Sequence, residues 1–307
     1  MKAFYSDRFV LPLPDGHRFP MTKYRLLRER IERDLPQVTL LEPEPATDGV
    51  LALGHTPDWI ERLSLGRLTP LEQRQIGFPW SPAMVERSRR SVGATLAACR
   101  AALQDGAAAN LAGGTHHAGP DRGEGFCCFN DVAVAARLMQ AERRARRVAI
   151  IDLDVHQGNG TAEILRNDPS VFTLSIHGAR NFPFRYRCEG DLDVDLPDDT
   201  PDDAYLDALD AALAALAARF EPDFLIFLAG ADVYQGDRLG RLALSIPGIA
   251  ERDRRVFEWA RVRGVPVAVA MGGGYCTEVE RIVDIHFGTI REAQAHAASG
   301  VARQALR

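Results

Sequence analysis

The chain reads Val148-Ala149-Ile150-Ile151 followed directly by Asp152-Leu153-Asp154-Val155-His156, and this stretch decides the fold class. Four consecutive apolar residues without alternation are typical of a strand that is covered on both faces, as in a parallel sheet. In the extended chain that follows, Asp152, Asp154 and His156 are spaced two residues apart, so their side chains point the same way. The stretch therefore predicts a buried parallel strand with a group of polar side chains at its carboxyl end.

Apolar runs of the same character recur along the chain, at residues 109–112, 171–176, 224–228 and 265–270. Helical patterns separate them, and the first has a start signal at Ser81-Pro82 and a stop signal at Gly106. We expect helices at residues 82–105, about 130–146, 202–220 and 249–263. Strands that alternate with helices predict a doubly wound α/β fold with right-handed crossovers. Since no repeat or long linker is apparent, we expect residues 1–307 to form a single domain.

Composition narrows the classes of function. The chain has 307 residues and a formal net charge of -5, which argues against a dedicated nucleic-acid binder. Its five cysteines include no Cys-x-x-Cys pair, so they predict neither a disulfide framework nor a structural zinc site of that type. No apolar leader and no apolar run of membrane-spanning length stand out. We therefore expect a reduced cytoplasmic protein without a membrane span.

Polar groups follow four of the expected strands. Besides residues 152–156, these groups lie in Gly113-Gly114-Thr115-His116-His117, Ala229-Gly230-Ala231-Asp232 and Gly272-Gly273-Gly274-Tyr275. Each segment alone has an ordinary explanation, because an aspartate can cap a turn or a helix. Three glycines can form a tight turn or a phosphate loop, although the GxGxxG spacing is missing. Ligands bind at the carboxyl edge of open parallel sheets, so the shared placement of the four segments favours a metal site.

The residue types fit hydrolysis of an unactivated amide. Two carboxylates and one imidazole, from Asp154, His156 and Asp232, leave a position open for water and substrate, as catalytic zinc requires. Such a metal polarises a carbonyl and lowers the pKa of its bound water. The pair His116-His117 supplies a general base and a general acid. The hydroxyl of Tyr275 can approach the developing oxyanion because its turn is rich in glycine.

These residues carry a family resemblance. From about His17 to Tyr275, nearly the whole chain, the sequence resembles the histone deacetylase superfamily, including bacterial deacetylase-like amidohydrolases. The matching pieces follow one another in order and are Gly114-Thr115-His116-His117-Ala118, Gly125-Phe126-Cys127, Phe129-Asn130-Asp131, Asp152-Leu153-Asp154-Val155-His156-Gln157-Gly158-Asn159-Gly160, Ser175-Ile176-His177, Gly230-Ala231-Asp232, Gly236-Asp237-Arg238-Leu239-Gly240 and Gly272-Gly273-Gly274-Tyr275.

The resemblance implies the arginase/deacetylase fold, a parallel sheet of about eight strands flanked by helices. It implies that zinc is bound by Asp154, His156 and Asp232. It also implies that His116 and His117 form the catalytic pair and that Tyr275 binds the substrate carbonyl. Asp152 would orient His116, and Asn159 would partner His117.

Asn159 departs from the pattern in much of the family, in which an aspartate partners the second histidine. An amide can accept the imidazole N–H, but it cannot stabilise an imidazolium by charge. We therefore expect His117 to stay neutral and to act as the general base, with His116 as its electrostatic partner.

The resemblance also implies two further sites. Structural potassium would be bound by Asp152, Asp154, His156, Ser175 and the backbone carbonyl of Ile176. The substrate channel would be lined by Gly125, Phe126, Gly273 and, on the opposite wall, Phe182 or Phe184. The Gln157-Gly158-Asn159 segment looks most like the class IV branch, which includes enzymes that prefer long fatty-acyl groups to acetyl. Long-chain deacylation is therefore one expectation.

The expected partner is an acylated lysine in a protein or peptide, and the alternative is an acylated small amine such as an acetylated polyamine. An arginase-like ureohydrolase would need additional ligands for a second metal, and Gln157 stands where one of them would be wanted. A non-catalytic binding module would be expected to lack a ligand or the tyrosine, and all of these residues are present. Iron(II) or cobalt could replace zinc at such an oxygen-rich site. The sequence points to no particular oligomeric state.

Overall fold

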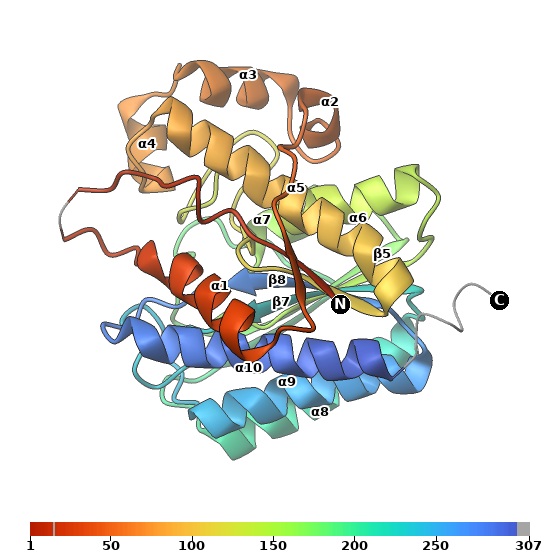
Figure 1. The fold of residues 1–307 in the computed structure, drawn as a ribbon. Helices are drawn as coiled ribbons and strands as arrows, with labels where there is room; N and C mark the ends of the chain where they lie inside the picture. Colours follow the sequence, from red (N-terminus) through yellow and green to blue (C-terminus); the bar gives the residue numbers. More distant parts are fainter. Residues whose placement is uncertain (15, 300–307) are drawn as a thin grey trace.

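The centre of the protein is one sheet of eight parallel strands (Figure 1), seen in a computed structural model that describes residues 1–14 and 16–299. The spatial order of the strands is β2-β1-β3-β8-β7-β4-β5-β6. The strands are β1 (Lys2–Phe4), β2 (Thr39–Leu41), β3 (Ala107–Asn110), β4 (Val148–Asp152), β5 (Val171–Gly178), β6 (Leu192–Leu196), β7 (Phe224–Gly230) and β8 (Val267–Gly272). The predicted parallel sheet of about eight strands is confirmed.

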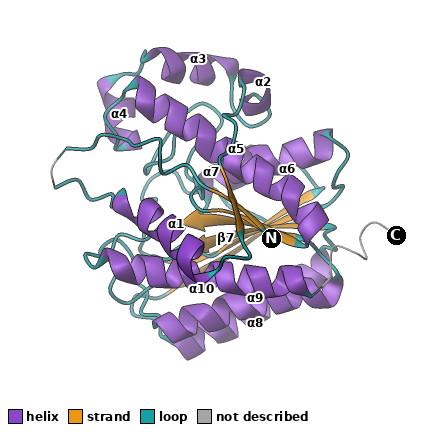
Figure 2. Cartoon of the chain, in the orientation of Figure 1, coloured by secondary structure: helices purple, strands orange, loops and turns teal. Residues whose placement is uncertain are grey.

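Helices cover both faces of the sheet (Figure 1, Figure 2). One face carries α2 (Asp48–Leu51), α3 (Pro57–Leu65), α4 (Pro70–Ile76), α5 (Pro82–Asp105), α6 (Asp131–Ala141) and α7 (Asn159–Leu165). The opposite face carries α1 (Thr22–Asp34), α8 (Asp202–Arg219), α9 (Ile246–Arg263) and α10 (Val279–Ala298). Among these described helices, none is long and apolar enough to cross a membrane.

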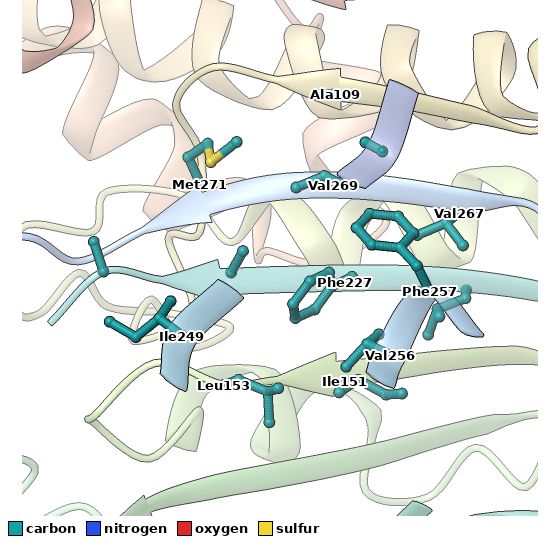
Figure 3. Packing of buried hydrophobic residues seen from close by; sticks show 14 of the residues in the cluster. Ala109, Ile151, Leu153, Phe227, Ile249, Val256, Phe257, Val267, Val269 and Met271 are labelled. Carbon is teal, nitrogen blue, oxygen red and sulfur yellow. The ribbon is translucent and has the colours of Figure 1, made fainter. Parts of the chain in front are cut away.

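Double coverage explains the unbroken apolar runs in the sequence. Successive residues of a strand point to opposite faces, and here both faces are buried. In β7, Phe227 packs on the side of α8, α9 and α10, whereas its neighbour Ile226 belongs to the cluster beneath α5 and α6. Figure 3 shows Phe227 near Phe257 of α9, and their ring centroids are 5.9 Å apart. Full burial of such a side chain contributes about 1.5–3 kcal/mol.

One predicted element was wrong in its extent. The helix expected at about 130–146 ends at Ala141, whereas the other expected boundaries lie within three residues of those observed. Arg143 adopts a φ of 57°, and the backbone N–H of Arg144 donates to the carbonyl of Met139 at 2.8 Å, so the chain turns out of the helix. The arginines of residues 143–147 therefore lie in the connection to β4.

The strands that carry polar groups are neighbours in the sheet. β3, β8, β7, β4 and β5 lie side by side and run in the same direction, so their carboxyl ends meet at one edge. Asp152 at the end of β4 pairs in register with Leu228 of β7 on one side and with Ser175 of β5 on the other. The loops that follow these strands therefore begin next to one another.

Helix α5 approaches the backbone of another segment at a glycine. A Cβ on Gly93 would collide with the carbonyl oxygen of Glu44, whereas a Cβ on Gly288 of α10 would meet nothing within 4 Å. Alanine is favoured over glycine inside a helix by about 0.5–1 kcal/mol. We expect Gly93→Ala to lower the free energy of unfolding by about 1–3 kcal/mol despite this gain, and Gly288→Ala to raise it. Urea denaturation measures both changes, and a stabilised Gly93→Ala protein would contradict the packing described.

Candidate active site

Asp154, His156 and Asp232 form a buried cluster at the carboxyl edge of the sheet. Asp154 and His156 follow β4, and Asp232 follows β7. One potential ligand atom from each residue lies within 4.8 Å of the other two. His156 Nδ1 is 2.8 Å from Asp154 Oδ1 and 3.3 Å from Asp232 Oδ2. The structure therefore brings together the three side chains that the sequence proposed as metal ligands.

This donor set fits a divalent cation. Oδ1 of the buried Asp232 accepts a hydrogen bond from Val155 N at 3.0 Å, but its Oδ2 accepts none among the described residues, because the contact with His156 Nδ1 at 3.3 Å lacks hydrogen-bond geometry. Burial and the charge of Asp154 raise the pKa of Asp232 to about 7. A buried carboxylate oxygen without a partner is costly unless a cation binds it. Carboxylates and an imidazole nitrogen are ligands that zinc and related metals accept.

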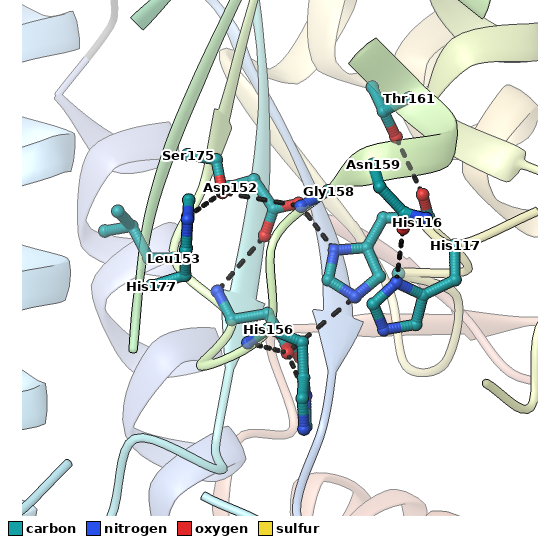
Figure 4. Close-up of polar contacts among 12 residues, drawn as sticks. His116, His117, Asp152, Leu153, His156, Gly158, Asn159, Thr161, Ser175 and His177 are labelled. Atoms are coloured by element: carbon teal, nitrogen blue, oxygen red, sulfur yellow. Dashed lines mark hydrogen bonds and ion pairs between the residues drawn. The ribbon is translucent and has the colours of Figure 1, made fainter. Parts of the chain in front are cut away.

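His116 and His117 lie beside this cluster, on the loop after β3 (Figure 4). Both side chains are buried, and their ring centroids are 4.1 Å apart. His116 Nδ1 is 2.6 Å from Asp152 Oδ2, and its Nε2 is 3.7 Å from Asp154 Oδ1. Burial by itself lowers the pKa of His116, but these two carboxylates raise it to about 9. Burial and the neighbouring His116 lower the pKa of His117 well below its ordinary value.

The amide of Asn159 fixes the orientation of His117. Its Nδ2 donates to the carbonyl of Tyr186 at 2.8 Å and to Glu124 Oε2 at 3.4 Å, so its Oδ1 faces His117 Nδ1 at 2.8 Å. An amide oxygen only accepts hydrogen bonds, so Nδ1 of His117 carries the proton. The other ring nitrogen, Nε2, keeps its lone pair. His117 is therefore held in the tautomer that can act as a base.

Tyr275 follows β8 on the glycine-rich turn. Gly273 has a φ of 58°, and a Cβ at this position would collide with the carboxylate of Asp232. Glycine is therefore required for the turn to approach the cluster. The backbone N–H of Tyr275 donates to Asp237 Oδ2 at 2.6 Å, and the Tyr275 ring centroid is 6.5 Å from that of His156.

Aromatic rings flank the approach to the histidines. The ring centroid of Phe126 is 5.8 Å from that of Tyr275, and the ring centroid of Phe182 is 4.7 Å from that of His117. Gly125 permits this arrangement, because a Cβ here would lie 2.6 Å from His117 Cδ2 and 3.1 Å from the ring of Phe182. The predicted channel residues Gly125, Phe126 and Phe182 therefore lie together beside the histidines.

Two hollows meet at the site. The inner one has a volume of about 60 Å³ and is lined by His116, Asp154 and Met271, among others. The outer one has a volume of about 530 Å³ and is lined by Phe182 and by Phe184, which is 76% exposed. His117, His156 and Tyr275 border both. The site is therefore a small inner space behind a wide mouth, and Phe184 belongs to the mouth rather than to the wall beside the histidines.

Ser175 and Ile176, the additional residues predicted for potassium, lie on β5 next to the end of β4. Asp152 and Ser175 are paired in register. Asp152 Oδ1 accepts a hydrogen bond from Asp154 N at 3.1 Å, and Ser175 Oγ is 2.9 Å from His177 Nδ1 (Figure 4). The residues predicted for this second site are therefore close neighbours of the Asp154 cluster.

Comparison with known proteins decides the family. The family model of the histone deacetylase domain matches residues 17–290. The chain belongs to the histone deacetylase family. An uncharacterized protein of Picosynechococcus is 43% identical to it over 92% of this chain and 94% of the relative. Histone deacetylase 2 of Arabidopsis thaliana is 32% identical over 87% of this chain and 72% of the relative. The acetoin utilization protein AcuC of Bacillus subtilis is 34% identical over 76% of this chain and 66% of the relative.

Solved structures agree with this assignment. The crystal structure of a histone deacetylase homolog from Aquifex aeolicus matches with a TM-score of 0.83 and 25% identity, over 98% of this chain and 88% of that one. The HD domain of HDA15 shares the fold, with a TM-score of 0.81 and 22% identity over 100% of this chain and 95% of that one. The predicted histone deacetylase resemblance and fold are confirmed. Membership of this family supports a hydrolase of the deacetylase type.

The sequence did not reveal which residues hold the histidine loop of this family member. Asp131 is fully buried at the start of α6, and it accepts hydrogen bonds from Gly114 N at 3.1 Å and from Thr115 N at 2.8 Å. Its neighbour Asn130 donates to the carbonyl of His116 at 3.3 Å. In the sequence, both residues stand at the start of a predicted helix within a segment that matches the family. Asn and Asp are common there because they cap helices, so their type gave no sign of this role.

Lys23 of α1 was also not predicted. Its side chain is buried, and its Nζ donates to the carbonyls of Gly273 and Gly274 and lies 5.2 Å from the centroid of the Tyr275 ring. Helix α1 therefore supports the turn that carries Tyr275. Lys23 follows no strand, so the placement of polar groups at strand ends gave no signal for it.

Removing the carboxylate of Asp131 tests the support of the histidine loop. Asp131→Ala leaves the half-buried N–H groups of Gly114 and Thr115 without their acceptor, so we expect the free energy of unfolding to fall by about 1–3 kcal/mol. The control is Asp207→Ala at an exposed position of α8, which should change it by less than about 0.5 kcal/mol. Chemical denaturation compares the two, and equal stabilities would refute the supporting role.

Proposed function

We propose that this protein hydrolyses the amide of N-acyl-lysine with the help of a zinc ion, releasing a carboxylate and the free amine. The observation that carries the proposal is the buried cluster of Asp154, His156 and Asp232 directly beside His116 and His117. Family membership supports the reaction class, and the aromatic side chains along the approach suit the apolar stem of an acylated lysine.

In this proposal Asp154, His156 and Asp232 hold the metal. The buried Oδ2 of Asp232, which accepts no hydrogen bond among the described residues, favours a cation at this position. When bound there, zinc would polarise the substrate carbonyl and lower the pKa of the attacking water. Iron(II) or cobalt would serve as substitutes, because two of the three ligands are hard oxygen donors.

The remaining chemistry belongs to side chains of the chain itself. His117, whose Nδ1 proton is held by Asn159, accepts a proton from water through Nε2 as the water oxygen bonds to the amide carbon. The hydroxyl of Tyr275 donates a hydrogen bond to the carbonyl oxygen as negative charge develops. The C–N bond then breaks, and the proton passes from the histidine to the leaving amine. His116, paired with Asp152, stabilises negative charge beside the reacting carbon.

Three further expectations from the sequence remain proposals. Asp152, Asp154, His156, Ser175 and the carbonyl of Ile176 would hold structural potassium, and their grouping around the end of β4 suits that role. Residues 1–307 would act as one catalytic domain, since a single sheet takes strands from residue 2 to residue 272. A cytoplasmic location stays a prediction.

The inner hollow favours a short acyl group. Its volume is about 60 Å³. A space of this size suits the few non-hydrogen atoms of an acetyl group. A long fatty-acyl chain, which the resemblance to the class IV branch allowed, needs more space than this, so the apolar lining of the hollow, which includes Leu11, Phe19 and Met84, would have to move apart. We therefore propose acetyl as the preferred acyl group.

Steady-state kinetics of the metal-loaded protein test the proposed reaction. On one lysine peptide that carries acetyl, butyryl, octanoyl or myristoyl groups, we expect hydrolysis with a kcat/KM that falls by about tenfold or more from acetyl to myristoyl, because the inner space is small. Absence of hydrolysis on every substrate, an acetylated polyamine included, would overturn the enzymatic proposal. A profile that favours myristoyl would overturn only the short-acyl preference.

A matched pair of variants tests the metal ligands in the same assay. Asp232→Asn keeps the shape of the side chain but removes its charge, so we expect weaker zinc binding, measured as metal content after dialysis, and loss of turnover. Asp207→Asn on the exposed face of α8 should match the parent protein in both. Full zinc content in Asp232→Asn would argue against Asp232 as a ligand.

Separate alanine substitutions test the division of labour between the histidines. His117→Ala removes the proposed base, and we expect kcat to fall by about 10²–10⁴-fold. His116→Ala should cost less, because this residue acts through its charge, and both variants should keep their zinc. If His117→Ala kept substantial turnover while His116→Ala lost all of it, the assignment of roles would be wrong.

A further inference from the structure

The mouth of the channel is lined by arginines. Five of them border the outer hollow, from four separate segments of the chain, and they are Arg18, Arg74, Arg180, Arg238 and Arg241. None of the described residues that line this hollow is an aspartate or a glutamate. The chain as a whole has 42 acidic residues against 37 lysines and arginines. The mouth is therefore positively charged, although the chain as a whole carries a net negative charge.

Ion pairs offset this charge only in part. Asp198 lies outside the hollow, 3.5 Å from Arg180 Nη1 and 3.0 Å from Arg241 Nη1, so that one carboxylate serves two guanidinium groups. Arg238 donates to the backbone carbonyls of Tyr275 and Arg18, at 2.8 and 3.2 Å, rather than to an acidic side chain. Arg18 and Arg74 are exposed, and within residues 1–14 and 16–299 no carboxylate pairs with either.

Arg238 ties this charge to the reacting end of the site. Its Nε binds the carbonyl of Tyr275, whose N–H is held by the neighbouring Asp237. The guanidinium of Arg238 is thus fixed beside the turn that carries the proposed carbonyl-binding hydroxyl. A substrate group that binds this arginine would be positioned relative to Tyr275, and would not simply rest on a mobile surface side chain.

We propose that the mouth selects acyl-lysines that are flanked by acidic residues in a peptide segment. This inference rests on the function proposed above and names the substrate class. Guanidinium groups stay charged at any physiological pH and bind carboxylates through two parallel hydrogen bonds. Because the five arginines come from four segments around an opening of about 530 Å³, they suit several carboxylates spaced along a peptide better than one compact anion.

The same charge acts against cationic ligands. An acylated lysine side chain is neutral, whereas the free lysine left after hydrolysis is cationic at neutral pH. The arginines therefore repel the product amine but not the acylated side chain, which favours release. They also repel an acetylated polyamine, whose remaining amines are cationic, and so the mouth favours a peptide over that alternative substrate.

Three peptides of one length test the inference, each with a central acetyl-lysine flanked on both sides by glutamate, glutamine or lysine. For the metal-loaded protein at low ionic strength, we expect kcat/KM to be about 5- to 30-fold higher with glutamate than with glutamine, and lowest with lysine. The preference should shrink at high ionic strength, because salt screens exposed charges. Equal kcat/KM values for the three peptides, or the reverse order, would overturn the proposal. A higher kcat/KM for an acetylated polyamine than for the glutamate peptide would also overturn it.

Substitutions locate the effect at the mouth. In the double variant Arg18→Gln and Arg74→Gln, the glutamate-to-glutamine ratio of kcat/KM should fall several-fold, whereas Arg291→Gln, on the exposed surface of α10, should keep the parent ratio. An unchanged ratio in the double variant would overturn the assignment to these arginines.

Binding provides a readout that does not depend on turnover. Calorimetry with Tyr275→Phe protein should give the glutamate peptide the lowest Kd of the three, and the Kd values should converge as salt is added. If the parent enzyme hydrolyses none of the peptides, the proposed function fails. If it hydrolyses all three equally and Tyr275→Phe protein binds them equally, only the acidic preference fails.

Discussion

Asp154 and Asp232 are buried carboxylates, and such groups are costly unless hydrogen bonds or cations surround them. Backbone N–H groups of the loop after β4 bind one oxygen of each, at 2.9 and 3.0 Å. Beneath them, the buried Arg252 of α9 donates to the carbonyls of Leu153 and Gly230, at 3.2 and 2.7 Å, and so joins the ends of β4 and β7. The need to accommodate buried negative charge thus fixes the two loops from which the rest of the site extends.

The fold and the centre of the site could be predicted from the sequence for a physical reason. A strand covered on both faces is typically apolar along most of its length, so β4, β7 and β8 stand out as continuous runs, and polar residues at or directly after their ends mark the carboxyl edge. The end of α6 could not be predicted in this way. Its sequence continues in residues that a helix accepts, and the turn at Arg143 is a property of the folded chain.

Other parts of the site depend on contacts between segments that are far apart in the sequence. Lys23 reaches the turn at Gly273 from α1, and Asp131 reaches back from α6 to the histidine loop. The arginines of the mouth lie on four segments, none of which carries a charge run of its own. No local pattern signals such roles, because each residue type is ordinary where it occurs. The role of Asn159 could be predicted only because its position matches that of the aspartate that partners the second histidine in much of the family.

The sheet order also bears on how the protein is made. β7 and β8, which follow the other described strands along the chain, lie in the sheet between β3 and β4, which precede them in the sequence. A nascent chain that ends before β7 has Asp154 and His156 but lacks Asp232, so the complete cluster cannot form on it. In the folded sheet, the strands β1 to β3 do not pair directly with β4 to β6, because β7 and β8 lie between the two groups. Pairing between strands that are far apart in the sequence closes long loops, which slows folding. The cluster of Asp154, His156 and Asp232 therefore requires β7 to have paired with β4, which links formation of the site to completion of the centre of the sheet.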